Sequence, residues 1–377
     1  MRDPNDELER LKLDGLFREI GAVLGSPQGA RVVIAGRELL NFSSNDYLGL
    51  AESDGLRATF VEAIGKFGVG SGASRLVCGT QIPHRELEES LAAYLRKERA
   101  LVFSSGFAAA SGVLGAVLRK GDVVILDKLC HASLVDGARA SGATLRIFPH
   151  GNMERLESHL RWATGQIEGD GRVLVVTESV FSMDGDRSPL AEIVALKDRF
   201  GAWLLVDEAH AFGIIGPGGR GLAAELGVAE GVDLLMGTLG KAAGVAGGFV
   251  AAQRSLIELI LNRGRSFIYS TAAPAAQAMA GVEAVRILAS ADGDQLRARL
   301  WENIRAFSEE AESAIVPWIV GDEGVAMELS RQMRERGYLI PAIRFPTVAK
   351  GAARLRVTLS AAHEIEDVVE LRKVLTQ

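Results

Sequence analysis

From about residue 83 onward, short apolar runs alternate with longer segments of helical spacing, and this alternation constrains the fold more than any other feature. The apolar runs are nearly continuous, which is typical of strands buried on both faces of a parallel sheet. The sequence therefore predicts an α/β fold around a large, mostly parallel sheet that is sandwiched by helices. The expected strands are 100–103, 123–126, 145–148, 173–177, 203–206 and 234–236, and the expected helices are 83–96, 107–118, 132–140, 152–162 and 189–200.

The pattern changes beyond about residue 274, and this change indicates a second, smaller domain. Two longer helices are expected at 274–288 and 295–312, followed by strands near 317–320 and 354–360. A chain of 377 residues also exceeds the size that one hydrophobic core usually supports, so two lobes are expected on length alone. We therefore predict a smaller α+β C-terminal domain over 274–377.

An arm is expected ahead of the large domain. Apolar residues over 7–23 have the spacing of an amphipathic helix, and 31–42 has the pattern of a hairpin whose turn is Ala35-Gly36. The predicted organisation is thus an N-terminal helix and hairpin arm over 1–45, a large ligand-binding domain over 46–273, and the C-terminal domain.

Composition excludes several classes of function. The net charge of −6 comes from acidic and basic residues without long blocks of one sign, so neither a nucleic-acid groove nor an anionic membrane patch is indicated. No run of about 18 apolar residues could span a membrane, and the first residues do not resemble an export signal. Cys78 and Cys130 cannot form a disulfide framework and lack zinc-site spacing. We therefore expect a cytoplasmic protein without a metal site.

Polar residues follow five of the expected strands, at the edge where open α/β sheets bind their ligands. Any one of them could be an ordinary cap or turn residue, but together they indicate a single site. They are Ser104 to Phe107, Asp127 with His131, Glu178 with Ser182, Asp207 with His210, and Thr238 with Lys241.

One part of this edge suits a phosphate group. Ser105 and Gly106 open a predicted helix directly after a strand, so free backbone N–H groups and the positive end of the helix dipole would face an anion. Thr238 and Ser182 could add hydroxyl donors to the same anion, although Thr238 could equally cap its own turn.

The other residues at this edge suit an aromatic cofactor. Asp207 follows an apolar run and would be a costly buried anion unless it faced a cation such as a protonated ring nitrogen. His131 can present a flat face to a ring, and His210 lies close to Asp207 in the sequence. Lys241 could be a solvated loop lysine, but among Gly, Ala and Val its amine would lose hydration, which lowers the pKa and makes it a nucleophile. Together these features meet the requirements of pyridoxal 5′-phosphate.

Two other classes of enzyme are disfavoured. Residues 207–210 read D-E-A-H, the magnesium-binding string of one helicase group, but no G-x-x-x-x-G-K-[ST] phosphate loop precedes it, and Ala242 follows the only Gly-Lys pair near the site. His363 and Glu364 are not followed by a second histidine at the H-E-x-x-H spacing of metal hydrolases.

Nearly end to end, the sequence resembles the α-oxoamine synthases, a family of fold-type I pyridoxal phosphate enzymes. The resemblance implies a fold-type I transferase, the cofactor pyridoxal 5′-phosphate, and a homodimer with shared active sites. The motifs that carry it are NFSSNDYLGL (41–50), FGVGSGASRLVCG (67–79), SSGFAA (104–109), HASL (131–134), TESVFSMDGD (177–186), DEAH (207–210), GTLGKA (237–242), IYST (268–271) and PTVAKGAARLRVTLSAAH (346–363).

The resemblance also implies the catalytic residues. Lys241 would bind the cofactor covalently and later act as the general base. His131 would stack on the pyridine ring, and Asp207 would pair with its protonated nitrogen. His210 and Ser182 would contact the side of the ring that carries the phenolic oxygen.

Further binding residues follow from the same resemblance. Arg356 would grip the amino-acid carboxylate, a role that suits its planar guanidinium. The remaining implied contacts are Glu178 to the cofactor, Gly106, Phe107 and Thr238 to its phosphate, Ser270 and Thr271 to the phosphate of the neighbouring subunit, and Asn45 and Thr347 to the substrate.

The long match PTVAKGAARLR at 346–356 favours the branch of the family that serves biotin biosynthesis. That branch condenses L-alanine with a pimeloyl thioester, carried by coenzyme A or by an acyl carrier protein, and releases carbon dioxide. Glycine C-acetyltransferase, which uses glycine and acetyl-CoA, stays open, as do other acyl chain lengths. A fold-type I aminotransferase fits the HASL and SMDGD motifs less well.

Two positions depart from the family pattern. The family often has an arginine in its N-terminal helix for the acyl substrate, but that register falls on Phe17, with Arg18 beside it, so the sequence assigns this contact to neither. Cys130 stands where relatives commonly have serine, and a small buried side chain is its expected role.

Overall fold

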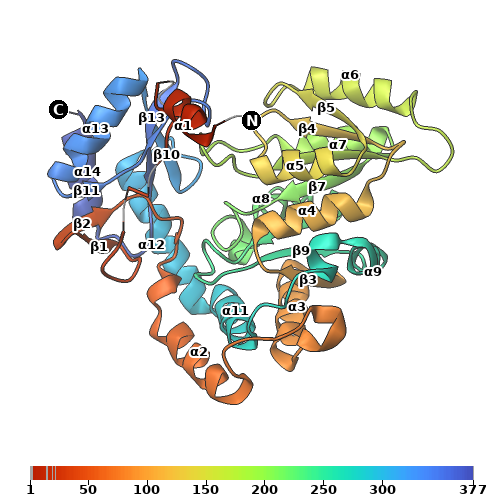
Figure 1. The fold of residues 1–377 in the computed structure, drawn as a ribbon, viewed down its shortest axis with the longest axis horizontal. Coiled ribbons are helices and arrows are strands. Elements are labelled where there is room, and N and C mark those ends of the chain that lie inside the picture. The colour runs from red at the N-terminus through yellow and green to blue at the C-terminus, as the bar shows by residue number, and fades with distance from the viewer. Residues whose placement is uncertain (1–2, 14–15, 19, 22, 377) are drawn as a thin grey trace.

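A seven-stranded sheet forms the centre of the larger lobe in the computed structural model, which describes residues 3–13, 16–18, 20–21 and 23–376 (Figure 1). The strand order is β3-β9-β8-β7-β6-β4-β5. β9 runs antiparallel to both of its neighbours, and all pairs from β8 to β5 are parallel, so the predicted mostly parallel sheet is confirmed. The strands are β3 (Arg99–Phe103), β4 (Val123–Asp127), β5 (Thr144–Phe148), β6 (Val173–Glu178), β7 (Trp203–Asp207), β8 (Leu234–Thr238) and β9 (Gly248–Ala252).

Both faces of this sheet are buried, as the continuous apolar runs predicted. In β4, Val124 and Leu126 belong to one hydrophobic core, whereas Val123 and Ile125 belong to another, because successive side chains of a strand point to opposite faces. The first core also includes residues of α4 (Gly106–Val117), α5 (Ala132–Ala140) and α9 (Arg254–Arg263), and the second includes residues of α3 (Ile82–Leu95), α6 (Met153–Thr164) and α7 (Leu190–Arg199).

The expected strands and helices of this lobe are confirmed, with ends that shift by at most two residues. The structure differs around Lys241. β8 continues through Gly237 and Thr238, two residues beyond the expected strand 234–236, and the next strand of the sheet, β9, begins only at Gly248. Glycine is needed there because a Cβ would lie 2.4 Å from the Ser105 carbonyl oxygen, so β9 can approach the start of α4 closely.

The smaller lobe contains the predicted C-terminal strands. β10 (Ile315–Gly321), β13 (Ala353–Thr358) and β12 (Ala342–Ile343) form an antiparallel sheet in the order β10-β13-β12. The helix expected over 295–312 is α12 (Ala291–Phe307), which starts earlier because the Ser290 side chain caps it. The other helices after β9 are α10 (Arg265–Ile268), α11 (Ala275–Leu288), α13 (Glu323–Glu335) and α14 (Ile365–Thr376).

One helix bears on the boundary expected between the large domain and the C-terminal domain. α11 packs against α3 and against α2 (Asp54–Phe67) as well as against α12, so it contacts both parts of the chain. The boundary at residue 274 therefore stays a prediction.

The N-terminal arm contains the expected hairpin but a shorter helix than expected. β1 (Arg31–Ile34) and β2 (Arg37–Asn41) are joined at Ala35 and Gly36, whose φ angles of 51° and 78° suit a tight hairpin turn. β11 (Tyr338–Leu339) pairs with β2 in parallel.

The helix predicted over 7–23 is instead α1 (Pro4–Leu13), and the described residues after it are not helical, including Phe17 and Arg18. Residues 14, 15, 19 and 22 of this prediction lie outside the described residues. α1 buries none of its residues, so no packing stabilises a longer helix.

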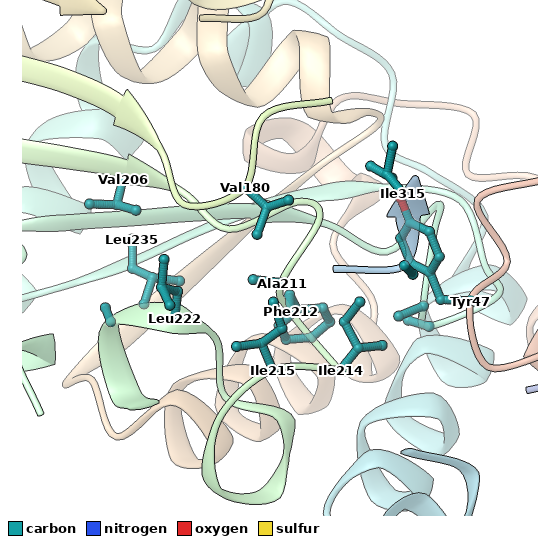
Figure 2. Close-up of a cluster of buried hydrophobic side chains, with 14 of the residues drawn as sticks. Tyr47, Val180, Val206, Ala211, Phe212, Ile214, Ile215, Leu222, Leu235 and Ile315 are labelled. Carbon is teal, nitrogen blue, oxygen red and sulfur yellow. The ribbon is translucent and has the colours of Figure 1, made fainter. Parts of the chain in front are cut away.

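One hydrophobic core extends from below the sheet to the smaller lobe (Figure 2). Its path ends at Tyr47, which is completely buried, and at Ile315 of β10. Val206 and Leu235 belong to the sheet strands β7 and β8, and the residues between the sheet and these two ends are Leu222, Ala211, Phe212, Ile215 and Ile214. Among the residues that the structure describes, no helix combines the length and apolar character needed to cross a bilayer.

Candidate active site

The predicted residues at the ends of the sheet strands surround one cavity of about 180 Å³. The cavity lies where β6, β7 and β8 end and where α4 and α5 begin. Its lining residues are Gly106, Phe107, His131, Ser133, Glu178, Asp207, Ala209, His210, Gly237, Thr238 and Lys241. The structure thus brings together most of the residues that the sequence singled out.

Lys241 contributes an amine that is poorly hydrated. Its Nζ lies 2.8 Å from Nε2 of His210. Burial lowers the pKa of Lys241 below its ordinary value, and the nearby carboxylates of Asp207 and Glu178 only partly oppose this effect. The unprotonated, nucleophilic form of the amine is therefore more accessible than for a surface lysine.

His210 connects Lys241 to a tyrosine that the sequence analysis did not single out. Nδ1 of His210 lies 2.5 Å from the hydroxyl of Tyr47, which in turn donates a hydrogen bond to Oδ1 of Asn45 at 3.2 Å. Burial, together with the charges of Lys241 and Arg356, lowers the pKa of His210 well below its ordinary value, so the ring is neutral. A proton on Nδ1 satisfies this chain, because Nε2 can then accept from Lys241.

Arg356 reaches the same chain from β13 of the smaller lobe. Its Nη1 and Nη2 both donate to Oδ1 of Asn45 at 3.2 Å, and its Nε donates to the Ser182 carbonyl oxygen at 2.6 Å. Nη1 also donates to Oγ1 of Thr358 at 2.9 Å. Arg356, Asn45, Tyr47, His210 and Lys241 are thus linked by successive hydrogen bonds across the two lobes.

Two carboxylates lie side by side at the ends of β6 and β7. Glu178 and Asp207 are paired in the sheet register, and both are buried. Burial raises the pKa of Asp207, while the positive charge of Lys241 opposes that shift. Burial also raises the pKa of Glu178, and the charge of Asp207 adds to the effect. Such a pair favours a cationic or protonated ligand group nearby.

His131 both caps a helix and lines the cavity. Its Nδ1 accepts a hydrogen bond from the backbone N–H of Ser133 at 3.2 Å, which caps α5 and fixes the ring. Its own backbone N–H donates to the Glu178 carboxylate. Partial burial lowers the pKa of His131, so its ring is neutral at physiological pH.

The start of α4 offers backbone donors to an anion. Ser105 caps the helix by accepting a hydrogen bond from the N–H of Ala108 at 3.1 Å, and Gly106 and Phe107 line the cavity. Thr238 also lines it, but its hydroxyl donates to the Gly247 carbonyl oxygen at 2.8 Å and accepts from Gly240 N–H at 3.1 Å. In this structure Thr238 therefore caps its own turn.

Other predicted residues lie outside this cavity. Ser182 meets Arg356 through its carbonyl oxygen, as described above. Thr271 is exposed and forms an isolated bridge with Ser74, and Ser270 precedes it. Thr347 lines a second, larger cavity of about 660 Å³, together with Phe17, Arg18 and residues 342–346.

Over the described residues, no group of three or more His, Cys, Asp or Glu side chains is arranged to hold a metal ion. Cys130 is buried, and burial raises the pKa of its thiol, which makes the reactive thiolate unfavourable.

Comparisons with known proteins agree with this geometry. The family model described as aminotransferase class I and II matches residues 37–375. The 8-amino-7-oxononanoate synthase of Geobacter sulfurreducens is 46% identical over 372 residues, which cover 96% of this chain and 94% of that protein.

Two solved structures extend the comparison. A variant of serine palmitoyltransferase from S. paucimobilis with a bound PLP–myriocin aldimine has a TM-score of 0.90 at 30% identity, covering 99% of this chain and 96% of that chain. The 8-amino-7-oxononanoate synthase from Francisella tularensis has a TM-score of 0.75 at 27% identity, covering 89% and 96% respectively. The fold is therefore that of the fold-type I transferases. The chain belongs to the aminotransferase class I and II family and, within it, to the α-oxoamine synthases.

Proposed function

We propose that this chain condenses L-alanine with a pimeloyl thioester, releasing carbon dioxide and the free thiol and forming 8-amino-7-oxononanoate in biotin biosynthesis. Its cofactor is pyridoxal 5′-phosphate. The full-length similarity to 8-amino-7-oxononanoate synthases supports the reaction. The structural observation that carries it is the poorly hydrated amine of Lys241, which faces a cavity shared with Asp207 and His131.

The residues in the cavity fit this cofactor. The Lys241 amine can bind an aldehyde carbon, the Asp207 carboxylate can hold a protonated ring nitrogen, and the His131 ring can stack on an aromatic face. The backbone N–H groups of Gly106 and Phe107 can receive the phosphate. When bound, the cofactor supplies an electron sink that stabilises negative charge at the amino-acid α-carbon.

Lys241 and the two residues linked to it by hydrogen bonds, His210 and Tyr47, are proposed to handle the proton of the alanine α-carbon. Lys241 would accept the proton from the α-carbon of alanine as the general base and would later return one to the product. His210 is neutral and accepts a hydrogen bond from Lys241, so it keeps the amine directed into the cavity. Tyr47 holds the other side of the His210 ring and thereby fixes its tautomer.

Arg356 is proposed to bind the alanine carboxylate. Oδ1 of Asn45 now accepts from both Nη atoms, in the way that a carboxylate oxygen would. A bound alanine would therefore replace the neutral Asn45 oxygen with a charged carboxylate oxygen, and the hydrogen bonds from Arg356 would become stronger. Thr347 is proposed to contact the acyl substrate from the second cavity, where it lies beside Phe17 and Arg18.

We also propose a cytoplasmic homodimer. Exposed apolar side chains lie on η2 (Arg75–Gly79), on its flanks and at the cavity edge, and they would be covered by a second copy. They are Val69, Leu76, Val77, Ile82, Phe107 and Tyr269. Ser270 and Thr271 are adjacent to this surface, which fits their expected contact with the neighbouring subunit's phosphate. Light scattering of the purified protein tests the dimer, and a monomer at micromolar concentration would contradict it.

One observation favours a second candidate reaction, that of a serine palmitoyltransferase. The TM-score is higher for serine palmitoyltransferase than for the solved 8-amino-7-oxononanoate synthase, 0.90 against 0.75. Fold similarity of this kind reports the framework, whereas substrate choice depends on the side chains of the site. The 46% identity to the Geobacter enzyme, against 30% to serine palmitoyltransferase, therefore supports alanine and a pimeloyl thioester as the substrates.

A competition assay tests the reaction. Alanine, glycine and serine are each paired with pimeloyl-CoA, acetyl-CoA and palmitoyl-CoA, and products are identified by mass spectrometry while carbon dioxide is measured. We expect alanine with pimeloyl-CoA to give the highest kcat/KM, and pimeloyl-acyl carrier protein is compared next as the alternative carrier. A preference for glycine with acetyl-CoA, or for serine with palmitoyl-CoA, would overturn the assignment.

A further inference from the structure

His150, directly after the edge strand β5 and its following proline, lies between two carboxylates that the proposed function does not use. Its Nδ1 lies 3.0 Å from Oδ1 of Asp127, and its Nε2 lies 2.7 Å from Oδ2 of Asp186. A carboxylate only accepts hydrogen bonds, so both contacts are satisfied at once only by the doubly protonated ring. The two carboxylates raise the pKa of His150 to about 10, and the ring is a cation at physiological pH.

Asp127 shapes the turn that carries His131. It is buried at the end of β4, and its carboxylate also accepts hydrogen bonds from the backbone N–H groups of Leu129 at 2.8 Å and Gly151 at 3.0 Å. Its carbonyl oxygen accepts from the Cys130 N–H at 3.1 Å. These contacts close residues 127–130 into a tight turn, so the position of Asp127 determines where His131 enters the cavity.

Asp186 closes the turn after β6, which contacts Arg356 of β13. The Phe181 N–H donates to the Asp186 carbonyl oxygen at 3.1 Å, and the Phe181 ring lies edge-on to the His150 ring with 4.3 Å between centroids. Within this turn, the Ser182 carbonyl oxygen accepts from Nε of Arg356 at 2.6 Å. The turn after β6 therefore sets the orientation of the guanidinium.

We propose that His150 is a positioning residue for the reaction: its cation, held between Asp127 and Asp186, fixes the turn that carries His131 relative to the turn that orients Arg356. The inference rests on the proposed function, in which His131 contacts the cofactor and Arg356 binds the alanine carboxylate. In this proposal, His150 itself contacts neither the cofactor nor the alanine carboxylate. A neutral ring could donate to only one of the two carboxylates, and the other would then face it without a partner from this side chain.

His150→Gln tests the proposal, with His159→Gln on the neighbouring helix α6 as the matched control. We expect the Kd for pyridoxal phosphate and the KM for L-alanine each to rise about tenfold in His150→Gln, because small displacements of binding groups are costly. We expect kcat to change less than KM, the visible circular dichroism of the bound cofactor to change, and the melting temperature to match that of the control. Unchanged Kd, KM and dichroism would overturn the proposal. So would a variant in which Kd, KM and kcat all worsen equally and the melting temperature falls as well.

A double-mutant cycle supplies the second test and serves if His150→Gln folds poorly. Asp186→Ala removes one carboxylate, and we expect it to raise the KM for alanine as His150→Gln does. If the two residues act through one contact, the double variant will be within about twofold of the worse single variant. Effects that simply multiply in the double variant, or an Asp186→Ala enzyme with an unchanged KM, would contradict the proposed link.

The outcomes separate this proposal from the proposed function. A wild-type enzyme that rejects pimeloyl thioesters, with variants that still weaken cofactor and amino-acid binding, overturns the acyl assignment and supports the role of His150. A wild-type enzyme that performs the proposed reaction, with His150 variants equal to the control, supports the acyl assignment and overturns the role of His150. A wild-type protein that binds neither pyridoxal phosphate nor an amino acid overturns both.

Discussion

The cavity around Lys241 and the cavity beside residues 342–347 are built in opposite ways. The first is small, about 180 Å³, and is lined from the ends of neighbouring strands of one rigid sheet. The second is larger, about 660 Å³, and its described lining consists of residues 16–18, Met327 and the segment around the short strand β12. Strand ends position side chains more precisely than connecting segments do.

The difference indicates a division of labour. In the first cavity, Lys241 and His210 are joined by a hydrogen bond, and burial shifts the pKa of both groups and of the two neighbouring carboxylates away from their ordinary values. Such shifts are what acid–base and nucleophilic chemistry needs. The second cavity is larger and is lined by Arg18, Arg344 and Thr347 together with apolar side chains. We therefore expect substitutions in the first cavity to change turnover, and substitutions in the second to change the choice of acyl chain.

Replacement of the lysine is the strongest test of this division. Lys241→Ala is expected to lower kcat by about a thousandfold or more, because one residue both holds the cofactor and moves the proton. Lys373→Ala, on the exposed face of α14, is the matched control and should keep the wild-type rate. Turnover of the Lys241 variant within about tenfold of wild type would remove the lysine from the chemistry.

Asp207→Asn is expected to have the next largest effect. The neutral amide cannot hold a protonated ring nitrogen, so kcat should fall by about a hundredfold while the KM for the acyl thioester changes little. Steady-state kinetics with both substrates varied gives the two parameters separately. The control is Asp136→Asn on the exposed face of α5, and a variant of Asp207 that behaves like this control would contradict its role.

The pH dependence of cofactor capture should reflect the lowered pKa of Lys241. Only the unprotonated amine attacks an aldehyde, so the capture rate of the apoenzyme should rise about tenfold per pH unit below that pKa and level off above it. Because burial lowers the pKa, the plateau should appear at a lower pH than for free N-acetyl-lysine. Stopped-flow absorbance measures the capture rate of the apoenzyme and that of the free lysine derivative. If the two rates rise in parallel over the same pH range, the amine of Lys241 is fully solvated.

The smallest effect is expected in the second cavity. Arg18→Ala should raise the KM for the pimeloyl thioester by about fivefold, with the Kd of pyridoxal phosphate unchanged, because the loss is confined to acyl binding. Arg10→Ala on α1 is the control in the same segment. A fall in cofactor affinity, or no change in any parameter, would break the proposed separation of the two cavities.

The sequence predicts the sheet well because its strands are buried on both faces and read as continuous apolar runs. It predicts the ends of the chain less well. The helix expected over 7–23 ends at Leu13, because the apolar residues of α1 remain exposed and add no packing energy. The place of the antiparallel strand β9 depends on a contact that local spacing does not report, because Gly248 passes close to Ser105.

The predictable part of the candidate site is the part whose residues follow strands. Asp207, Glu178 and Lys241 were found in this way, and the structure places them together. Tyr47 and His150 were missed although Tyr47 lies inside a quoted motif and His150 follows an expected strand closely. Their importance depends on partners far along the chain, His210 for Tyr47 and Asp186 for His150, and such contacts exist only in the folded molecule.

Reduction of the holoenzyme with borohydride, followed by peptide mass spectrometry, is the most direct test of whether Lys241 holds the cofactor. We expect the purified protein to be yellow and the reduction to fix a phosphopyridoxyl group on Lys241 alone. A protein that takes up no pyridoxal phosphate, or a label on a different lysine, would contradict it.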